Sequence, residues 1–298
     1  MLFRSVQPKH NKPIYAFCSP PADVCDGAFD VLRAAGIPNY PSPNRVSRVM
    51  ALNAQWLGAR KALQARGKAN ATTNLPALPS GTGALNEAQS KQTLSACGLG
   101  VTRDVVVPAA PIEQAPAITF PVALKIVSKD IPHKTDAGGV KLHIPDAAAL
   151  KQASIDMLEV VRKHSPKAQL EGLLVSEMIA DGIETIVGVI NDAVFGPVIA
   201  FGLGGTLAEI MKDVTYRLAP FNEATAREMI GELRAAKIFA GVRGAPPRDV
   251  DALARLLANI SQYAWAQRKR IAEMDINPVL VRPVGKGAVA ADALIVLR

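Results

Sequence analysis

The sequence predicts an α/β protein with more than one hydrophobic core, and three observations support this prediction. Hydrophobic residues make up 49% of the 298 residues and charged residues 20%, which is the ordinary balance of a soluble α/β protein. Short apolar stretches of strand length recur along residues 121–297. Longer stretches with an apolar face at helical spacing accompany them, at 146–164 and 246–270.

The first expected elements are a strand at residues 14–18 and helices at 24–36 and 46–63. This order fits a piece of a doubly wound sheet. One strand with two or three helices cannot bury much apolar surface on its own. Residues 67–84 are rich in Gly, Ala, Asn, Thr and Pro without an apolar period, which predicts a flexible linker.

A helix is expected directly after this linker, because residues 85–101 carry leucines and small residues at helical spacing. Asn86 is suited to cap its start and Gly98 its end. Residues 108–120 contain three prolines, so we expect a loop with a shortened turn of helix there.

The stretch 121–144 is the most informative part of the chain. Alternating apolar residues around Lys125 predict a strand that projects one cation into an otherwise apolar pocket, and 139–144 is its expected partner strand. Gly138 and Gly139, between the two, allow backbone N–H groups to approach phosphate oxygens closely. A glycine pair also suits an ordinary hairpin turn, so the residues alone leave both interpretations open.

Two further strands are expected in residues 173–189, with Glu177 at the end of the first and Glu184 at the start of the second. The backbone after a buried strand can pair with an adenine edge. A carboxylate at the start of the next strand can accept hydrogen bonds from ribose hydroxyls. A solvated pair of edge strands is the alternative interpretation.

Residues 196–220 combine a buried strand, a glycine-rich turn and a helix-like stretch that carries Glu209 and Asp213. These two acids are four residues apart, so on a helix they share one face. There they can order a loop, approach a metal ion or hold Arg217.

Three oxygen-bearing side chains near the C-terminal end suggest a metal site. Asp275 and Asn277 are two residues apart on an expected strand, 272–283, so their side chains point the same way. Asp292 is expected on a partner strand in 289–297. Mg²⁺ favours a few carboxylate or amide oxygens and completes its shell with water and nucleotide phosphates. The alternative is that these polar residues simply face water.

The order of these motifs resembles that of one protein family. The lysine strand is followed by HKTDAGGVK, LVSEM, ETIVGV, FGPVIAFGLGGTLAEIMKD and EMDINP. From about Leu85 to Arg298 the chain resembles the ATP-grasp domain of NDP-forming acyl-CoA synthetases, relatives of succinyl-CoA synthetase that include ADP-forming acetate–CoA ligases. The resemblance implies two α+β subdomains that clamp Mg·ATP. It also implies conversion of an acid, CoA and ATP into acyl-CoA, ADP and phosphate through a phosphohistidine.

The resemblance also implies roles for individual residues. His133 is expected to take the phosphoryl group, since a neutral imidazole is a competent nucleophile near pH 7. Lys134 and Arg217 are expected to stabilise developing phosphoryl charge. Adenine is expected at Glu177-Met178 and ribose at Glu184. The expected metal ligands are Asp275, Asn277 and Asp292. The expected ATP-binding residues are Lys125, Gly138, Gly139, Val140, Glu177, Met178, Glu184, Gly204, Gly205 and Glu209.

The N-terminal part, AAGIPNYPSPNRVSRVMALNAQW, resembles the end of the flavodoxin-like CoA-ligase domain of single-chain members of the same family. We therefore expect residues 1–66 to be the C-terminal part of that domain, 67–84 a linker and 85–298 the ATP-grasp domain. The CoA-binding and remaining ligase domains would then be missing from this chain. A natural split subunit and an incomplete gene both explain this. We favour the second, because a subunit boundary should fall between domains rather than inside one.

The net charge of +8 is concentrated in residues 1–70, which hold ten Lys and Arg against three Asp and Glu. No aromatic and basic RNA-binding motif accompanies it, so a solvated face explains it better than nucleic acid. We find neither a membrane-helix run nor a signal peptide in the sequence. We expect a cytoplasmic homo- or hetero-oligomer whose partners are nucleotide, phosphate and acyl-CoA. The rival interpretations are a regulatory nucleotide-binding module of a synthetase-like protein acetyltransferase and an inactive fragment.

Overall fold

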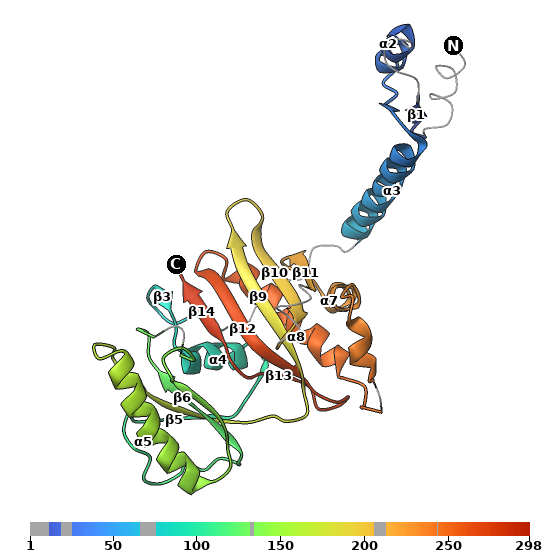
Figure 1. Ribbon diagram of the computed structural model, residues 1–298. Helices are drawn as coiled ribbons and strands as arrows, with labels where there is room; N and C mark the ends of the chain where they lie inside the picture. Colours follow the sequence, from blue (N-terminus) through green and yellow to red (C-terminus); the bar gives the residue numbers. More distant parts are fainter. Residues whose placement is uncertain (1–11, 19–25, 66–75, 132–133, 206–212, 243) are drawn as a thin grey trace. The chain divides into compact units, whose positions relative to one another are not determined.

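The computed structural model describes residues 12–18, 26–65, 76–131, 134–205, 213–242 and 244–298 (Figure 1). The chain divides into two compact units, Met1–Lys68 and Ala69–Arg298. Each unit is described by itself below.

The first unit is a small parallel pair of strands with two helices. β1 (Ala16–Phe17) pairs with β2 (Asn39–Tyr40), and α2 (Asp26–Ala34) connects them. The long helix α3 (Pro43–Ala65) follows. The expected strand and two helices are therefore present, with β2 in addition. Several large apolar side chains of α3 are exposed, in keeping with the small core expected here: Met50, Leu52, Trp56 and Leu57.

The second unit contains a four-stranded antiparallel sheet in the order β5-β8-β6-β7, called the small sheet here. Helix α5 (Ala147–His164) packs on it, capped by the Asp146 carboxylate, which accepts the N–H of Ala149 at 2.8 Å. Figure 1 shows α5 lying against these strands. The strands are β5 (Asp104–Val107), β6 (Val122–Val127), β7 (Val140–Ile144) and β8 (Gly172–Glu177).

The second unit also contains an eight-stranded sheet, the large sheet, with β11-β10-β9-β12-β13-β4 in order; in addition, β14 pairs with β12, and β3 pairs with β14. Helices α7 (Glu223–Gly231) and α8 (Val250–Ala266) and the 3₁₀ helix η2 (Ala236–Ala240) contribute to its core, while α4 (Glu87–Ala96) contacts β4 and β14. The strands are β3 (Gly83–Ala84), β4 (Gly100–Val101), β9 (Ile183–Asp192), β10 (Gly196–Leu203), β11 (Val214–Leu218), β12 (Ile271–Val281), β13 (Ala288–Ala290) and β14 (Leu294–Leu297).

These two sheets establish the expected mixed helix and sheet architecture, and most expected elements are confirmed. The Asn86 cap of α4 is present, with a reciprocal bond between Asn86 and Gln89, and Gly98 has the left-handed φ of 78° that a helix end favours. Residues 108–120 contain no helix. The helix expected from residue 246 begins later, at Val250, where the Asp249 carboxylate caps it.

Three boundaries differ from the expectation. Residues 76–84 are part of the second unit rather than linker, because β3 pairs with β14 and the Arg270 guanidinium donates to the carbonyl oxygens of Pro79 and Gly81. Asp213 immediately precedes strand β11 and is not inside a helix. The stretch 289–297 divides into β13 and β14, and Asp292 lies in the break between them instead of on a strand.

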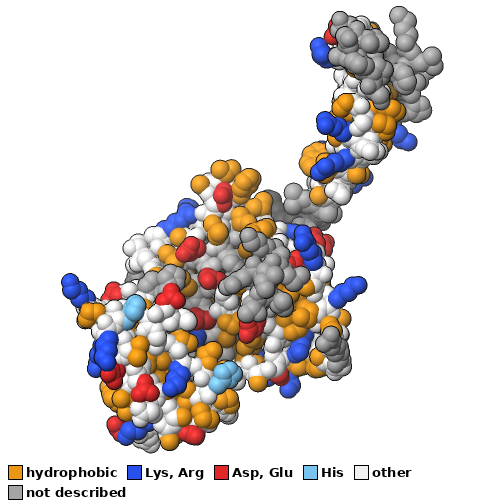
Figure 2. All heavy atoms as spheres, in the orientation of Figure 1, with side chains coloured by type: hydrophobic (Ala, Val, Ile, Leu, Met, Phe, Trp, Pro, Cys, Tyr) orange, Lys and Arg blue, Asp and Glu red, His pale blue; other side chains and the backbone are white. Residues whose placement is uncertain are grey.

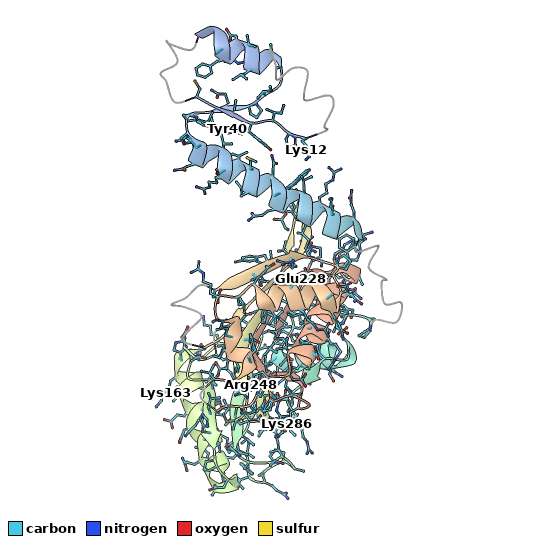
Figure 3. The ribbon with its side chains drawn as sticks, turned by 90° about the vertical axis from the view of Figure 1, so that its right-hand side faces the viewer. Lys12, Tyr40, Lys163, Glu228, Arg248 and Lys286 are labelled. Carbon is cyan, nitrogen blue, oxygen red and sulfur yellow. The ribbon has the colours of Figure 1, made fainter. Side chains whose placement is uncertain are left out.

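The connection from β8 to β9 joins the small sheet to the large sheet, and Asp181 fixes it. The Asp181 carboxylate accepts a hydrogen bond from Arg282 at 3.0 Å and lies 3.5 Å from the Lys286 ammonium, while Arg248 donates to the Asp181 carbonyl at 2.7 Å. Arg248 and Lys286 lie on the same side of the unit in Figure 3. These contacts hold the connection against β12 and the turn that follows it.

Exposed apolar side chains gather at the free end of the β9–β10 hairpin, where Ile190, Val194 and Phe195 are exposed (Figure 2). No helix among the described residues combines the length and the hydropathy needed to cross a membrane.

Candidate functional site

The candidate site is a cavity of about 360 Å³ where the two sheets of the second unit face each other. The start of α4 lines one part of it, the segment that follows β6 lines another, and β12 with residues 292–294 completes the wall. Side chains from four separated parts of the chain thus meet here.

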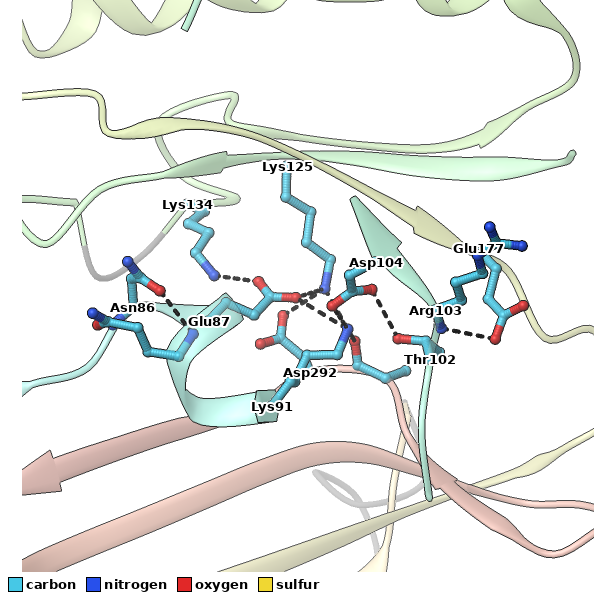
Figure 4. A network of polar contacts seen from close by, with 12 residues as sticks. Asn86, Glu87, Lys91, Thr102, Arg103, Asp104, Lys125, Lys134, Glu177 and Asp292 are labelled. Atoms are coloured by element: carbon cyan, nitrogen blue, oxygen red, sulfur yellow. Dashed lines mark hydrogen bonds and ion pairs between the residues drawn. The ribbon is translucent and has the colours of Figure 1, made fainter. Parts of the chain in front are cut away.

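Lys125, on β6, is almost fully buried and contacts two residues that line this cavity, Glu87 and Asp292. Its ammonium donates to Glu87 Oε1 at 2.6 Å, to Asp292 Oδ2 at 2.8 Å and to the Ala291 carbonyl at 3.3 Å (Figure 4). All three N–H donors of the ammonium are therefore used. Burial alone would lower the pKa of Lys125, but the two carboxylates raise it, so the side chain carries its charge.

Glu87 is the second centre of the site, and the sequence did not point to it. Its carboxylate is 1% exposed and receives Lys125 on one oxygen and Lys134 on the other, the latter at 2.5 Å. Burial raises the pKa of Glu87, but Lys125, Lys134 and Lys91 outweigh that effect and lower it, so the side chain is ionised. In the sequence Glu87 is only an acid in the first turn of a helix, which ordinarily means a solvated residue favoured by the helix dipole.

Lys91, one turn further along α4, is also buried and was also missed. Its ammonium lies 2.6 Å from Asp104 Oδ2 and 3.8 Å from Glu87 Oε1, and donates to the Ala291 carbonyl at 3.2 Å. Among the described residues, the ion pairs at the centre of Figure 4 join three lysines, Lys91, Lys125 and Lys134, to three carboxylates, Glu87, Asp104 and Asp292. The spacing of Glu87 and Lys91, four residues apart on one helix face, was the available signal.

The three expected metal ligands, Asp275, Asn277 and Asp292, line the same cavity. Partial burial raises the pKa of Asp275, and the negative charges of Asp292 and Glu273 raise it further. Burial and Glu87 likewise raise the pKa of Asp292, with Lys125 acting against them. Two carboxylates whose charge is disfavoured by burial and by neighbouring acids, beside an amide oxygen, make a donor set that a divalent cation would stabilise.

This donor set fits Mg²⁺, which accepts carboxylate and amide oxygens and leaves positions for water and phosphate. In the described part of the chain, no group of three or more His, Cys, Asp or Glu side chains is arranged to hold a metal ion. The expected site contains two carboxylates and one amide, so it is an incomplete shell that other oxygens would have to complete.

The glycine turn after β6 is closed by its own backbone. The N–H of Gly139 donates to the Lys134 carbonyl at 2.7 Å, and the N–H of Gly138 donates to the Thr135 carbonyl at 3.1 Å. A Cβ on Gly139 would lie 2.6 Å from the Ile126 side chain, which explains the glycine by close packing. In this structure the pair therefore shapes the turn that carries Lys134, while Val140 lines the cavity.

The residues expected at adenine and ribose lie along the connection between the sheets. The Glu177 carboxylate accepts the Arg103 N–H at 2.8 Å, and the Met178 sulfur accepts the His143 N–H at 3.0 Å. Glu184 lies against the glycine turn after β10: its carbonyl accepts the Gly204 N–H at 2.8 Å. A Cβ on Gly205 would lie 2.9 Å from the Glu184 carboxylate, so Glu184, Gly204 and Gly205 are brought together.

Arg217 is not brought to the cavity. It lies on β11, and its guanidinium pairs with Glu232 at 2.5 Å and donates to the Tyr216 carbonyl. Asp213 accepts the N–H groups of Arg234 and Ala235, so it orders a loop, the first of the three roles considered for it. His133 and Glu209 fall outside the described residues.

Comparison with known proteins agrees with this architecture. The sequence model of a family described as "ATP-grasp domain" matches residues 76–297. The chain is 41% identical over 223 residues to the acetate–CoA ligase (ADP-forming) II subunit beta of Pyrococcus furiosus, covering 74% of this chain and 94% of that subunit. It is 36% identical over 281 residues to acetate–CoA ligase (ADP-forming) I of Archaeoglobus fulgidus, covering 89% of this chain but 40% of that protein.

Two solved structures are similar in fold and sequence. PH1788 from Pyrococcus horikoshii has a TM-score of 0.68 at 41% identity, covering 73% of this chain and 92% of that one. The Korarchaeum cryptofilum dinucleotide-forming acetyl-coenzyme A synthetase 1, in complex with coenzyme A and Ca-AMPCP, has a TM-score of 0.68 at 38% identity, covering 72% and 94%. The chain thus belongs to the ATP-grasp domain family and, within it, to the group that contains the beta subunits of ADP-forming acetate–CoA ligases.

Proposed function

We propose that this chain is the nucleotide-binding and phosphoryl-transferring part of an ADP-forming acyl-CoA synthetase. The full reaction converts a carboxylic acid, CoA and ATP into acyl-CoA, ADP and phosphate. The observation that supports this most strongly is that Lys134, Asp275, Asn277 and Asp292 line one cavity. The Lys125 ammonium pairs with Asp292 and with Glu87, which also lines this cavity. Phosphoryl transfer requires two things of a protein: cations that bind phosphate, and oxygen ligands that hold Mg²⁺.

The proposed roles are those that the family resemblance implies for these residues. The ammonium groups of Lys125 and Lys134 would bind phosphate oxygens, and the backbone at Glu177 and Met178 would meet adenine. Glu184 would accept hydrogen bonds from ribose hydroxyls. Asp292 and Asn277, with Asp275 beside them, would hold Mg²⁺, which neutralises phosphate charge when bound. Gly204 and Gly205 would form the backbone turn next to Glu184.

His133 is the proposed phosphoryl acceptor of this chain. A ring nitrogen would attack the γ-phosphorus while the bond to the bridging oxygen of ADP breaks, and the ring proton would pass to solvent. The phosphoryl group would then move on to the part of the enzyme that binds CoA and the acid. We expect that part on a partner protein or a further domain, and we expect the enzyme in the cytoplasm, where ATP and CoA are available.

The test is transfer of a radiolabelled γ-phosphate from Mg·ATP to the purified chain. We expect an acid-labile, base-stable label that ADP removes with return of labelled ATP, because phosphohistidine formation is reversible. His133→Ala should abolish the label. His164→Ala, which changes an exposed histidine at the end of α5, should leave it intact.

A chain that binds Mg·ATP tightly but takes no label, alone or with the CoA-binding subunit of an acetate–CoA ligase, would contradict phosphoryl transfer. That outcome would support the regulatory nucleotide-binding module instead. A chain that is folded and binds no nucleotide would contradict both functions.

A further inference from the structure

The two lysines proposed for phosphate already share one buried partner, the carboxylate of Glu87. Lys125 lies 2.6 Å from one carboxylate oxygen and Lys134 lies 2.5 Å from the other (Figure 4). Among the described residues, Glu87 is the hydrogen-bond partner of the Lys134 ammonium. A carboxylate that bridges two cations in this way has the charge and the acceptor geometry of a phosphate edge.

Glu87 cannot leave this position easily. It is the first residue of α4, and the reciprocal bonds between Asn86 and Gln89 fix that end of the helix at 2.9 and 3.1 Å. Its side chain is 1% exposed, so turning away would leave the charge in the protein interior without water. The contact also joins α4, which packs with the large sheet, to Lys125 of the small sheet and to Lys134 in the turn between β6 and β7.

An incoming polyphosphate must therefore compete with an internal anion. The network is balanced without a ligand, with Lys91, Lys125 and Lys134 against Glu87, Asp104 and Asp292. Lys125 has no spare N–H donor until one of its partners is drawn away. Asp292 is the partner that a metal ion can draw away, since it also lines the expected Mg²⁺ site.

We propose that Glu87 is a built-in counter-ion that holds Lys125 and Lys134 in place, limits the affinity of the site for bare polyphosphate and makes phosphate binding depend on the metal. This inference rests on the proposed nucleotide site. Glu87 is a positioning residue here, because it acts on phosphate through the two lysines.

The experiment is calorimetric titration of the full chain with inorganic tripolyphosphate in metal-free buffer and with ADP in the presence of Mg²⁺. Glu87→Gln keeps the shape of the side chain and removes its charge. We expect this variant to bind metal-free tripolyphosphate at least about tenfold more tightly than the wild type, because an unneutralised cation remains beside the ligand. The matched control, Glu171→Gln, removes an exposed charge that accepts a hydrogen bond from Asn86, and should change the affinity by less than about threefold.

A second variant tests the same point should Glu87→Gln unfold, as a thermal melt would show. The double variant Glu87→Gln with Lys134→Met removes one charge of each sign and leaves the network balanced. We expect it to bind metal-free tripolyphosphate at least about tenfold more tightly than Lys134→Met alone, because only the double variant lacks the internal anion. A folded double variant that binds tripolyphosphate no more tightly than Lys134→Met would contradict control by charge.

The outcomes separate this inference from the proposed function. The proposed role of Glu87 alone would be overturned if the wild-type chain binds Mg·ADP and a folded Glu87→Gln variant binds tripolyphosphate no more tightly than the wild type. A folded wild-type chain that binds neither Mg·ADP nor tripolyphosphate would overturn the proposed nucleotide site itself.

Discussion

At the scale of single residues, the cavity is a place where charges are held close together in the protein. Lys125 and Glu87 are paired and buried. Burial and the charge of Asp292 raise the pKa of Asp275, whereas burial and the charge of Glu87 raise the pKa of Asp292. Such repulsion between like charges costs stability until a cation binds, and it is common where a protein keeps a ligand site ready.

Replacing Asp275 tests this trade between stability and binding. Asp275→Asn removes one of two like charges, so we expect a higher melting temperature in metal-free buffer and weaker binding of Mg·ADP. The matched control is Glu273→Gln, two residues earlier on β12, which removes another like charge from outside the cavity lining. This control variant should raise the melting temperature without weakening the binding of Mg·ADP. Equal effects of both variants on binding would contradict a ligand role for Asp275.

The sequence indicated those residues of the candidate site whose burial or strand face can be read from the residues next to them in the chain. Lys125 stands out as a lone cation in an apolar strand, and Asp275 and Asn277 share one face by strand alternation. Glu87 and Lys91 were missed because their burial depends on β6 and on residues 291–292, which are distant in sequence. Arg217 was placed at the phosphates by the family resemblance, but in this structure its partner is Glu232 at the end of α7.

At the scale of elements, Asp249 connects the start of α8 to the turn between β12 and β13. Its carboxylate accepts the N–H groups of Ala252 at 3.0 Å, Gly285 at 2.9 Å and Gly287 at 3.1 Å. Burial raises the pKa of Asp249, but these backbone donors and Arg255 outweigh it and lower the pKa below 3.8. The helix cap and the hairpin turn therefore depend on one ionised side chain.

Asp249→Ala should lower the free energy of unfolding by about 0.5–2 kcal/mol at neutral pH, because it removes a helix cap and the acceptor of two N–H groups in the turn. Since the folded pKa is lowered, this contribution is fully present above the ordinary value of 3.8 and is lost as the pH falls through the lower folded pKa. Denaturant unfolding of both proteins across this range measures the difference.

The control for this prediction is Asp251→Ala, which changes an exposed acid in the first turn of the same helix and should cost less. A difference between wild type and Asp249→Ala that grows as the pH falls below 3.8 would contradict the account.

Element positions were largely predictable, and the failures have local reasons. Strands β6, β8, β9, β10 and β12 are apolar runs whose pattern does not depend on context. Strand β3 is two residues long and is defined only by its pairing with β14, so composition suggested linker instead. Asp292 was expected on a strand because it is the only polar residue in 289–297, yet the strand is interrupted there and the Asp292 side chain reaches Lys125.

At the scale of the whole molecule, the second unit contains two hydrophobic cores, one under each sheet, and the cavity lies where the two sheets face each other. Its charged network connects the sheets through Glu87 and Asp292 on one side and Lys125 and Lys134 on the other. Both cores could be predicted from apolar periodicity. That the two sheets enclose one site could be predicted only from the order of the motifs along the chain, and not from any single motif.

The central claim is that this cavity binds a nucleotide with Mg²⁺, and calorimetric titration of the chain with ADP, with and without Mg²⁺, tests it most directly. The variants are Lys125→Met, which removes the buried cation, and Lys151→Met, which removes a cation paired with Glu113 at the surface. We expect saturable, Mg²⁺-dependent binding by the wild type and by Lys151→Met, and at least about tenfold weaker binding by Lys125→Met. Equal affinity of the wild type and a folded Lys125→Met variant would contradict the account.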